Sequence, residues 1–397
     1  MKIFLVNFWQ TVGSTGGTEK VLCNMANELS ERGAQITVVC CDNENGLPFF
    51  PLSQKVNFIN LNGSGRDLKV SIPIKIQREF LRLIGLLDKY KMLIWLNSHY
   101  QQILEELSNL INVEKPDIII AFDPNSIMVL KYLLKNNSPT IAMLHLDCNL
   151  FFNEKMDNIL LNSFKNVNCI QVLNKSNIEI VRRYCPDIDV RYIPNVVEMS
   201  LTKKNYDKCY NKIITVSRIE ELGKRPHLLI KAFNKIYKEY YEWTLEVVGG
   251  TYTTSHEKYK TKILKFIEEN NLHNKVCLTG VTDKVEIKLQ KADIFAFPSA
   301  HEGFPLALTE AMAIGLPAIG YKTCAGVNEL IIDGYNGFLC EDGIDDFAEK
   351  LKILMQDAEL RKKMGQNARE SMKQFAPKKI WDEWEDLINK VVEESKK

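Results

Sequence analysis

Two glutamates eight positions apart, Glu302 and Glu310, have the chemistry to bind a ligand. A carboxylate accepts two hydrogen bonds at once, so each could hold a vicinal diol such as that of a ribose or a sugar. Gly303 would let such a ligand approach the backbone closely. The spacing alone is weak evidence, because a capping Glu302 and a solvent-facing Glu310 would explain it equally well.

The elements around these glutamates would place them at one edge of a sheet. Residues 293–298 form a short apolar run that is typical of a buried parallel strand. Pro305 suits the first position of a helix, and Gly315 suits its end. We therefore expect Glu302 in the loop after the strand and Glu310 about one turn inside the helix. The helix start would offer unpaired N–H groups and positive partial charge to a phosphate.

Two cations could serve the same site. Arg218 ends a strand-like run at 212–218, and Lys224 precedes a helix that Pro226 opens. Arginine supplies a fork of donors and lysine a point charge, so together they could stabilise a leaving diphosphate. By spacing alone, however, two solvated surface cations are the simpler interpretation.

The glutamate segment resembles the Glu-x7-Glu signature of retaining glycosyltransferases of the GT-B fold, family 4. Ser217-Arg218 followed by Gly223-Lys224 is similar to the diphosphate-binding Arg/Lys pair of that family, and the Pro194-Asn195 segment is similar to the end of its first domain. The family commonly has Lys-Gly where this chain has Lys224-Arg225. We expect Lys224, and not Arg225, to point inward.

The resemblance implies an α/β fold of two Rossmann-like domains facing a cleft. Residues 1–197 would form the acceptor-side domain and residues 198–375 the nucleotide-sugar domain, with the closing helix 376–397 packing back on the first. The order of strand-like and helical segments agrees, since strand, helix and strand at the start of the chain predict a parallel doubly wound sheet. The polar residues 200–211 suit an exposed linker.

The resemblance also implies the reaction, which is transfer of a sugar from a nucleotide diphosphate sugar (a UDP-sugar by expectation) to a hydroxyl of a glycan or lipid-linked glycan, with retained configuration. Glu310 would grip the ribose and Glu302 the donor sugar, while Arg218 and Lys224 stabilise the leaving group. Further donor contacts would come from these residues: Gly249, Val281, Gly303, Phe304, Pro305 and Leu306.

In the first half of the chain, Gly16 and Gly17 follow the first strand, and His145 follows a later one. The glycines match neither the dinucleotide fingerprint nor a P-loop, and a tight turn explains them as well as a binding role. A lone histidine is more often structural than catalytic. The resemblance adds that the Gly-Gly loop approaches donor or acceptor, and that His145 lies beside the donor sugar. Asp147 is a weaker candidate nearby.

Composition narrows the class of protein. The 397 residues are 45% hydrophobic with a net charge of +1, so two cores are expected and no overall field favours nucleic acid. Ten cysteines without metal-ligand spacing read as reduced thiols. We expect no metal and no cofactor, because the two cations would take the place of a metal ion.

Residues 69–96 alternate basic and apolar side chains. Such a segment could dock on an anionic bilayer and bring the enzyme to a lipid-linked acceptor, although an ordinary helix pair with a solvated basic face is the simpler interpretation. With no long apolar run, the sequence predicts a cytoplasmic protein, either free or peripheral to the inner face of the membrane.

Two other functions stay open at this point. A GT-B nucleotide-sugar epimerase would share the architecture and need no acceptor. A non-catalytic sugar-nucleotide-binding protein would bind without turnover, although the set of Arg218, Lys224, Glu302 and Glu310 argues against it.

Overall fold

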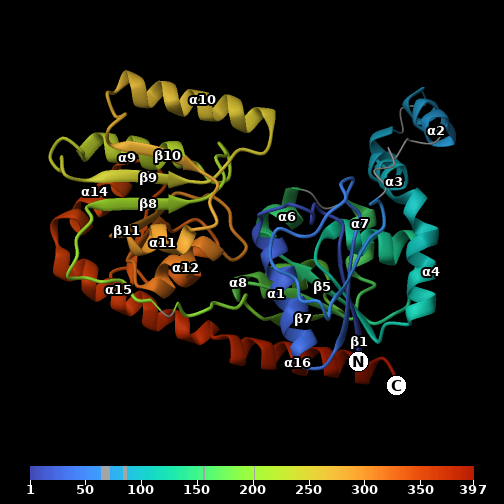
Figure 1. Ribbon diagram of the computed structural model, residues 1–397. Helices are drawn as coiled ribbons and strands as arrows, with labels where there is room; N and C mark the ends of the chain where they lie inside the picture. Colours follow the sequence, from blue (N-terminus) through green and yellow to red (C-terminus); the bar gives the residue numbers. More distant parts are fainter. Residues whose placement is uncertain (64–71, 84–86, 155–156, 201) are drawn as a thin grey trace. The chain divides into compact units, whose positions relative to one another are not determined.

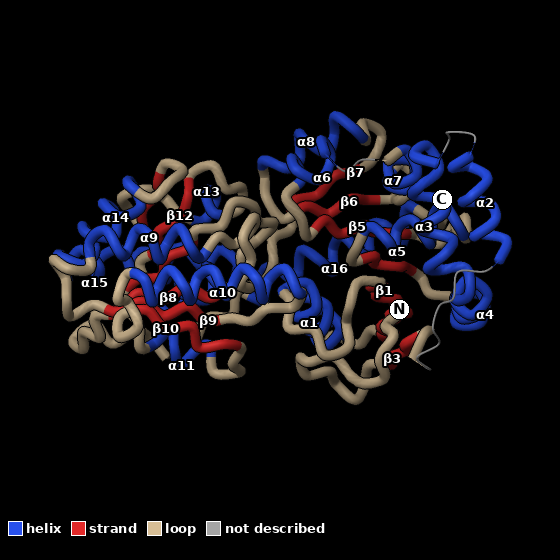
Figure 2. Tube along the Cα trace, turned by 90° about the horizontal axis from the view of Figure 1, so that it is seen from above, coloured by secondary structure: helices blue, strands red, loops and turns tan. Residues whose placement is uncertain are grey.

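A computed structural model describes residues 1–63, 72–83, 87–154, 157–200 and 202–397 (Figure 1). The chain divides into two compact units. The first unit comprises Met1–Ile193 and Trp381–Lys397, and the second comprises Pro194–Ile380. Each unit is built on one parallel sheet, and helices cover its strands (Figure 2). These two sheets confirm the predicted α/β fold class.

The first sheet has the strand order β3-β2-β1-β4-β5-β6-β7, and all its neighbours are parallel. Its inner strands are continuous apolar runs because helices bury both faces. The strands are β1 (Lys2–Asn7), β2 (Gln35–Cys40), β3 (Asn57–Asn60), β4 (Ile118–Ala121), β5 (Thr140–Leu144), β6 (Cys169–Val172) and β7 (Asp189–Tyr192).

The helices of the first unit lie between successive strands along the chain, except between β2 and β3. They are α1 (Gly17–Glu31), α2 (Ile72–Leu83), α3 (Leu87–Tyr100), α4 (Leu104–Glu114), α5 (Pro124–Met128), α6 (Cys148–Glu154), α7 (Asn158–Phe164) and α8 (Ser176–Tyr184), with a 3-10 turn η1 (Gln101–Ile103) and a π-helical turn η2 (Val129–Leu133). The predicted basic stretch 69–96 falls on α2 and α3, and its residues 69–71 and 84–86 lie outside the described residues.

The second sheet has the order β10-β9-β8-β11-β12-β13, also parallel throughout. Its strands are β8 (Lys212–Val216), β9 (Thr244–Val248), β10 (Val276–Gly280), β11 (Ile294–Phe297), β12 (Ala318–Tyr321) and β13 (Gly337–Cys340). Its helices are α9 (Pro226–Ile236), α10 (Thr254–Glu269), α11 (Val285–Gln290), α12 (Leu306–Ile314), α13 (Val327–Leu330), α14 (Asp345–Gln356) and α15 (Ala358–Met372), followed by a 3-10 turn η3 (Lys373–Phe375).

In both sheets the strand order reverses direction once. The reversal lies between β1 and β4 in the first unit and between β8 and β11 in the second. Helices leave the sheet in opposite directions at such a point, so the loops at the carboxyl ends of the two strands part and leave room for a ligand. The topology therefore predicts ligand sites at the loops after β8 and β11 and at those after β1 and β4.

The last helix, α16 (Pro377–Glu394), returns to the first unit, as the fold prediction required. Arg32, the C-cap residue of α1, donates to Asp382 at 2.8 Å and to Glu385 at 2.9 Å. Further along, Lys390 pairs with Asp189 of β7 at 2.8 Å. No helix among the described residues has an apolar stretch long enough to cross a bilayer.

The prediction of an exposed linker at 200–211 is wrong for Lys204, although most of the segment's described residues are exposed. Lys204 is only 6% exposed, and its Nζ lies 2.8 Å from Oδ1 of Asp293. Its N–H donates to the carbonyl of Ile314 at 3.0 Å, and the hydroxyl of Tyr206 donates to the carbonyl of Gly315 at 2.8 Å. This segment therefore fastens the end of α12, because it satisfies carbonyls that a helix end leaves open.

We expect Lys204→Ala to lower the free energy of unfolding of the second unit by roughly 3–5 kcal/mol, because Asp293 would stay buried without its countercharge. Urea unfolding followed by tryptophan fluorescence measures the change. The control is Lys55→Ala, which removes an exposed pair with Glu31 and should cost about 1 kcal/mol or less. Equal effects of the two variants would contradict this account of Lys204.

Candidate active site

The loops after β8 and β11 meet through an ion pair. Nζ of Lys224 lies 2.6 Å from Oε1 of Glu302, and the two side chains are only 18% and 9% exposed. The N–H of Ala300 donates to the carbonyl of Gly223 at 2.8 Å, so the backbones of the two loops are joined beside the pair. The structure thus brings the predicted Lys224 and Glu302 together at the point where the strand order reverses.

The structure also places Arg225, the residue that the sequence left open. Its Nε donates to the carbonyl of Pro298 at 3.1 Å and its Nη2 to Oδ1 of Asp342 at 3.2 Å, and its guanidinium lies 4.8 Å from the ring centre of Tyr321. Its backbone is left-handed, with φ of 49°, which is a costly conformation for a residue with a Cβ. Arg225 therefore holds the loop to the strands, whereas Lys224 meets Glu302.

Arg218 stands on the same edge. Its side chain is 55% exposed, and its Nη2 lies 3.6 Å from Oε2 of Glu220. At this distance and exposure the contact with Glu220 is a weak surface pair, so the guanidinium remains accessible to a stronger anion.

Two glycines, Gly249 and Gly280, lie at strand ends beside Arg218. Gly249 has φ of 145°, and a Cβ there would lie 1.9 Å from the carbonyl oxygen of Ser217, so no other residue fits. The N–H of Gly249 donates to the carbonyl of Gly280 at 2.9 Å. Val281 follows Gly280 and is 55% exposed. The ends of β8, β9 and β10 thus gather the predicted residues Arg218, Gly249 and Val281.

Helix α12 begins one residue later than predicted. Pro305 is the N-cap and not the first helical residue, because its ψ of 93° is extended. Pro305 makes no side-chain capping hydrogen bond at this end of the helix. The first N–H groups, from Leu306 onward, therefore have no partner within the helix and can donate to an anion. Gly315 ends the helix in a left-handed conformation, as predicted.

Of the other predicted residues in this segment, some can contact a ligand and others pack in the interior. Glu310 is half-buried and lies one turn along α12 from Leu306. Gly303 is buried, and a Cβ on Gly326 would lie 2.6 Å from its carbonyl oxygen, so a second loop presses on it. The ring of Phe304 packs edge-on against Phe375 at 5.4 Å, so its side chain is structural and only its backbone can serve a ligand.

Two serines at the site, Ser217 and Ser299, had no predicted role. The hydroxyls of Ser217 and Ser299 are buried, and neither has a hydrogen-bond partner among the described residues. Such groups are costly unless something satisfies them, and both lie where a strand ends at the site. Their signal in the sequence was a hydroxyl residue directly after an apolar strand.

In the first unit, the glycine loop after β1 is held by two buried carboxylates. Asp123 accepts the N–H of Phe8 at 2.7 Å, and Asp42 accepts the N–H groups of Thr11 and Val12 at 3.1 Å. Burial raises the pKa of both carboxyls. The predicted Gly16 and Gly17 follow this loop, where Gly16 is the N-cap and Gly17 the first residue of α1.

Gly16 lies close to a buried carboxylate. A Cβ on Gly16 would lie 2.1 Å from Oε2 of Glu19 in the first turn of α1, so a larger residue would require the Glu19 side chain to move. The binding role of Gly16 and Gly17 stays a prediction.

His145 directly follows β5, as predicted. Its ring stacks on Phe122 at 5.5 Å, and its Nε2 is buried with no partner among the described residues. Burial lowers the pKa of His145 to about 4. The ring is therefore neutral near pH 7 and would act on a ligand through its hydrogen-bonding nitrogens, not through charge. Asp147 accepts the N–H of Asn149 at 2.9 Å and so caps α6.

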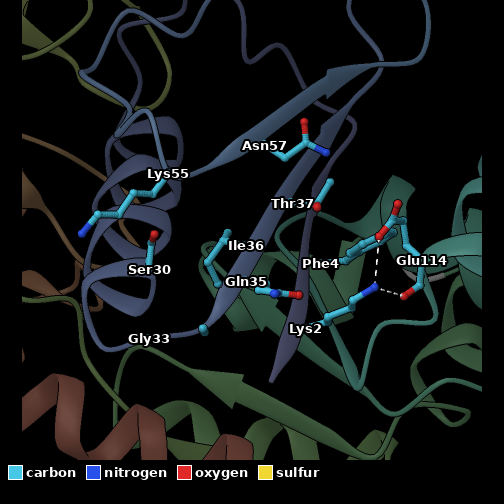
Figure 3. A pocket seen from close by; sticks show the side chains of 11 residues that line it. Lys2, Phe4, Ser30, Gly33, Gln35, Ile36, Thr37, Lys55, Asn57 and Glu114 are labelled. Atoms are coloured by element: carbon cyan, nitrogen blue, oxygen red, sulfur yellow. Dashed lines mark hydrogen bonds and ion pairs between the residues drawn. The ribbon is translucent and has the colours of Figure 1, made fainter.

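A hollow of about 390 Å³ lies at the opposite edge of the first sheet (Figure 3). It is lined by the amino ends of β1, β2 and β3. Its two lysines already have partners, since Lys2 bonds Glu114 and Lys55 bonds Glu31. It lies away from the carboxyl ends where open α/β sheets bind ligands, so we do not count it as part of the site.

Within the described part of the chain, no three His, Cys, Asp or Glu side chains gather as metal ligands. The expected independence from metal and cofactor stays a prediction.

Comparison with known proteins agrees with this geometry. The model of "Glycosyltransferase Family 4" matches residues 15–201, and that of "Glycosyl transferases group 1" matches residues 199–371. The chain belongs to the group 1 glycosyltransferases. Their two models span it almost from end to end and meet near the border of its two units.

Some relatives of this glycosyltransferase share little sequence identity with it but match it over nearly its whole length. An uncharacterized glycosyltransferase of Haemophilus influenzae is 26% identical over 395 residues, with 96% of this chain and 98% of the relative covered. Sucrose-phosphate synthase from Thermosynechococcus elongatus has a similar structure, with a TM-score of 0.79, 19% identity and 98% of each chain covered. A TarM variant of S. aureus, solved with fondaparinux, alpha-GlcNAc-glycerol and UDP, has a TM-score of 0.74 and 17% identity, with 98% and 99% covered. These structures confirm the GT-B fold.

The burial of His145 predicts a pH dependence. Its folded pKa of about 4 lies below its usual 6.5, so only the unfolded chain takes up the proton as the pH falls between these values. The first unit should therefore lose stability from pH 6.5 toward pH 4, by at most about 1.4 kcal/mol per pH unit from this residue. Thermal unfolding at several pH values tests it. His145→Gln should flatten this slope, and an unchanged slope would contradict the assignment.

Proposed function

We propose that this glycosyltransferase transfers a sugar from a nucleotide diphosphate sugar, a UDP-sugar by preference, to a hydroxyl of a glycan or lipid-linked glycan, with retention of configuration. The observation that carries the proposal is the Lys224–Glu302 pair beside the start of α12. The ammonium group of Lys224, the first N–H groups of α12 and the carboxylate of Glu302 lie close together. They could bind the diphosphate and the sugar of one donor. The UDP held by the related TarM structure supports the choice of base.

The diphosphate would lie against the start of α12. There the N–H groups from Leu306 onward, the Nζ of Lys224 and the exposed guanidinium of Arg218 can share its negative charge. Glu310, one turn along the helix, would accept the ribose hydroxyls. Gly249, Gly280 and Val281 would border the base. Ser217 and Ser299 offer hydroxyls that need a partner.

The reaction needs stabilisation of charge more than proton transfer. The acceptor oxygen bonds to the anomeric carbon while the bond from that carbon to the diphosphate breaks and the diphosphate leaves with the electron pair. With retention, the acceptor arrives on the face from which the diphosphate departs, so the hydroxyl proton can pass to the departing oxygen. Lys224 and Arg218 would stabilise that oxygen, and Glu302 would hold the sugar hydroxyls and favour positive charge on the ring.

We expect Lys224→Ala to lower kcat ~10²–10³-fold, because one donor to the leaving diphosphate is lost. Release of nucleoside diphosphate from a panel of nucleotide sugars measures the rate. Lys262→Ala is the matched control, because Lys262 pairs with Glu221 of the same loop and is 69% exposed. A Lys224→Ala enzyme as fast as this control would refute the proposed role. Turnover without any acceptor, to an isomerised nucleotide sugar, would indicate an epimerase instead.

Helix α2 gives the proposed membrane contact a surface. Ile76, Phe80 and Leu83 are 65%, 59% and 85% exposed, and their spacing places them on one face of the helix. Apolar side chains on a basic helix suit the headgroup region of an anionic bilayer. We propose that α2 docks there peripherally, at the inner face of the membrane, and so brings the enzyme to a lipid-linked acceptor.

Sedimentation with phosphatidylglycerol vesicles tests this contact. Phe80→Glu should weaken binding about tenfold, because it puts a charge that the lipid repels into the apolar face. Ile332→Glu, at a 54% exposed position of the second unit, should leave binding unchanged. Absence of vesicle binding by the wild-type protein at low salt would exclude the membrane contact without bearing on sugar transfer.

A further inference from the structure

The loop of residues 43–51, which connects β2 to β3, presents apolar side chains to solvent. Leu47 is 70% exposed and Phe49 is 49% exposed. The rings of Phe49 and Phe50 pack at 5.3 Å in a T-shaped arrangement, and about half of the Phe49 surface stays open to solvent. Exposed apolar groups of this kind mark binding sites when the backbone that carries them is fixed.

Hydrogen bonds fix the backbone of this loop at its start. The Nδ2 of Asn60 donates to the carbonyls of Asp42 at 3.1 Å and of Glu44 at 2.9 Å. The Nδ2 of Asn62 donates to Oδ1 of Asn43 at 2.6 Å. The side chains of two residues, Asn60 at the end of β3 and Asn62 in the turn after it, therefore shape the loop.

The end of the loop is fixed to α1. The Nδ2 of Asn27 donates to the carbonyl of Pro51 at 3.0 Å, and its Oδ1 accepts the N–H of Ser53 at 2.7 Å. With both ends held, Leu47 and Phe49 are exposed on a preorganised loop, which lowers the entropy that a ligand would have to offset.

The loop also touches the glycine loop that follows β1. The N–H of Gly13 donates to the carbonyl of Leu47 at 3.4 Å, and Val12 and Pro48 form an antiparallel bridge. Gly46 has φ of 152°, which residues with a side chain rarely adopt, and a Cβ there would make a tight contact of 3.0 Å with Cγ1 of Val12. Leu47 and Phe49 therefore stand at the carboxyl edge of the first sheet, where ligands of open α/β sheets bind.

The charge of the loop indicates the kind of ligand. Residues 42–54 contain Asp42 and Glu44 but no lysine or arginine. Asp42 is buried, so Glu44 is the exposed acidic residue, and the loop has no cation to attract an anionic bilayer, in contrast to the basic stretch around α2. A neutral sugar would complement this loop. Its apolar ring face could pack on Phe49 and Leu47, and its hydroxyls could bond the exposed polar residues Glu44 and Asn45.

We propose that the 43–51 loop binds an uncharged sugar ring of the acceptor by stacking it on Phe49, with Leu47 at its side. This inference rests on the proposed function and names the acceptor-binding element of the first unit. It makes Phe49 a specificity-determining residue that contacts acceptor and not donor.

Binding without turnover gives the first test. Saturation-transfer NMR with methyl glycosides of glucose, galactose, N-acetylglucosamine and N-acetylgalactosamine should show contact of at least one sugar with the wild-type protein. Phe49→Ala should weaken that binding about tenfold, the loss expected for one aromatic stacking contact. Phe49→Tyr should retain it. Leu264→Ala, a 47% exposed leucine of α10, is the control for loss of an exposed apolar group.

Kinetics give the second test once a donor and acceptor pair is in hand. Phe49→Ala should raise the acceptor KM about tenfold and leave kcat, the donor KM and donor hydrolysis without acceptor unchanged, because only acceptor binding is lost. An unchanged acceptor KM, or no wild-type binding to any glycoside, would overturn the proposal. So would loss of vesicle binding in Phe49→Ala, which would assign the loop to the membrane. Failure of donor turnover in every variant would instead count against the proposed function.

Discussion

The contact between Lys224 and Glu302 is the constraint on which the candidate site depends. Two charges that are this buried are costly unless each has a partner, and here each is the partner of the other. A diphosphate sugar would offer both of them a replacement, with phosphate oxygens for the lysine and hydroxyl groups for the glutamate. The pair therefore keeps two ligand-binding groups in place until a ligand provides each of them with a new partner.

The rest of the second unit keeps these two groups where they are. The parallel winding makes β8 and β11 neighbours, so residues far apart in the sequence follow adjacent strand ends. Arg225 accepts an unfavourable backbone conformation and ties its loop to Pro298 and Asp342. At the far end of α12, Lys204 and Asp293 form a buried pair that fastens the segment entering the unit. Each of these contacts fixes the backbone of a segment near the site, so that a ligand-binding side chain keeps its position.

Much of this was readable from the sequence, because the signals were local. Apolar runs predicted the central strands, Pro226 and Gly315 marked the ends of two helices, and the loop position of Glu302 followed from the strand before it. What could not be read depends on partners distant in the chain. The charge of Lys204 suggested solvent, since nothing near it in sequence shows that Asp293 would meet it.

The same limit applies to Arg225 and to the edge of the first sheet. The sequence offered two adjacent cations, Lys224 and Arg225, and gave no sign that Arg225 would contact the carbonyl of Pro298. Strand β3 is four residues long with half-buried side chains, so its alternation was too short to recognise. The hydrogen bonds of Asn27 and Asn60 hold the backbone of the 43–51 loop, and no spacing in the sequence reveals these bonds.

The most direct test of the central claim is calorimetric binding of UDP against UMP to the wild-type protein and to Lys224→Ala. If Lys224 and the start of α12 hold the second phosphate, UDP should bind the wild-type protein about a hundredfold more tightly than UMP, and Lys224→Ala should lose most of that advantage while UMP affinity stays the same. Equal affinities for UDP and UMP, or an advantage for UDP that survives the loss of Lys224, would contradict it.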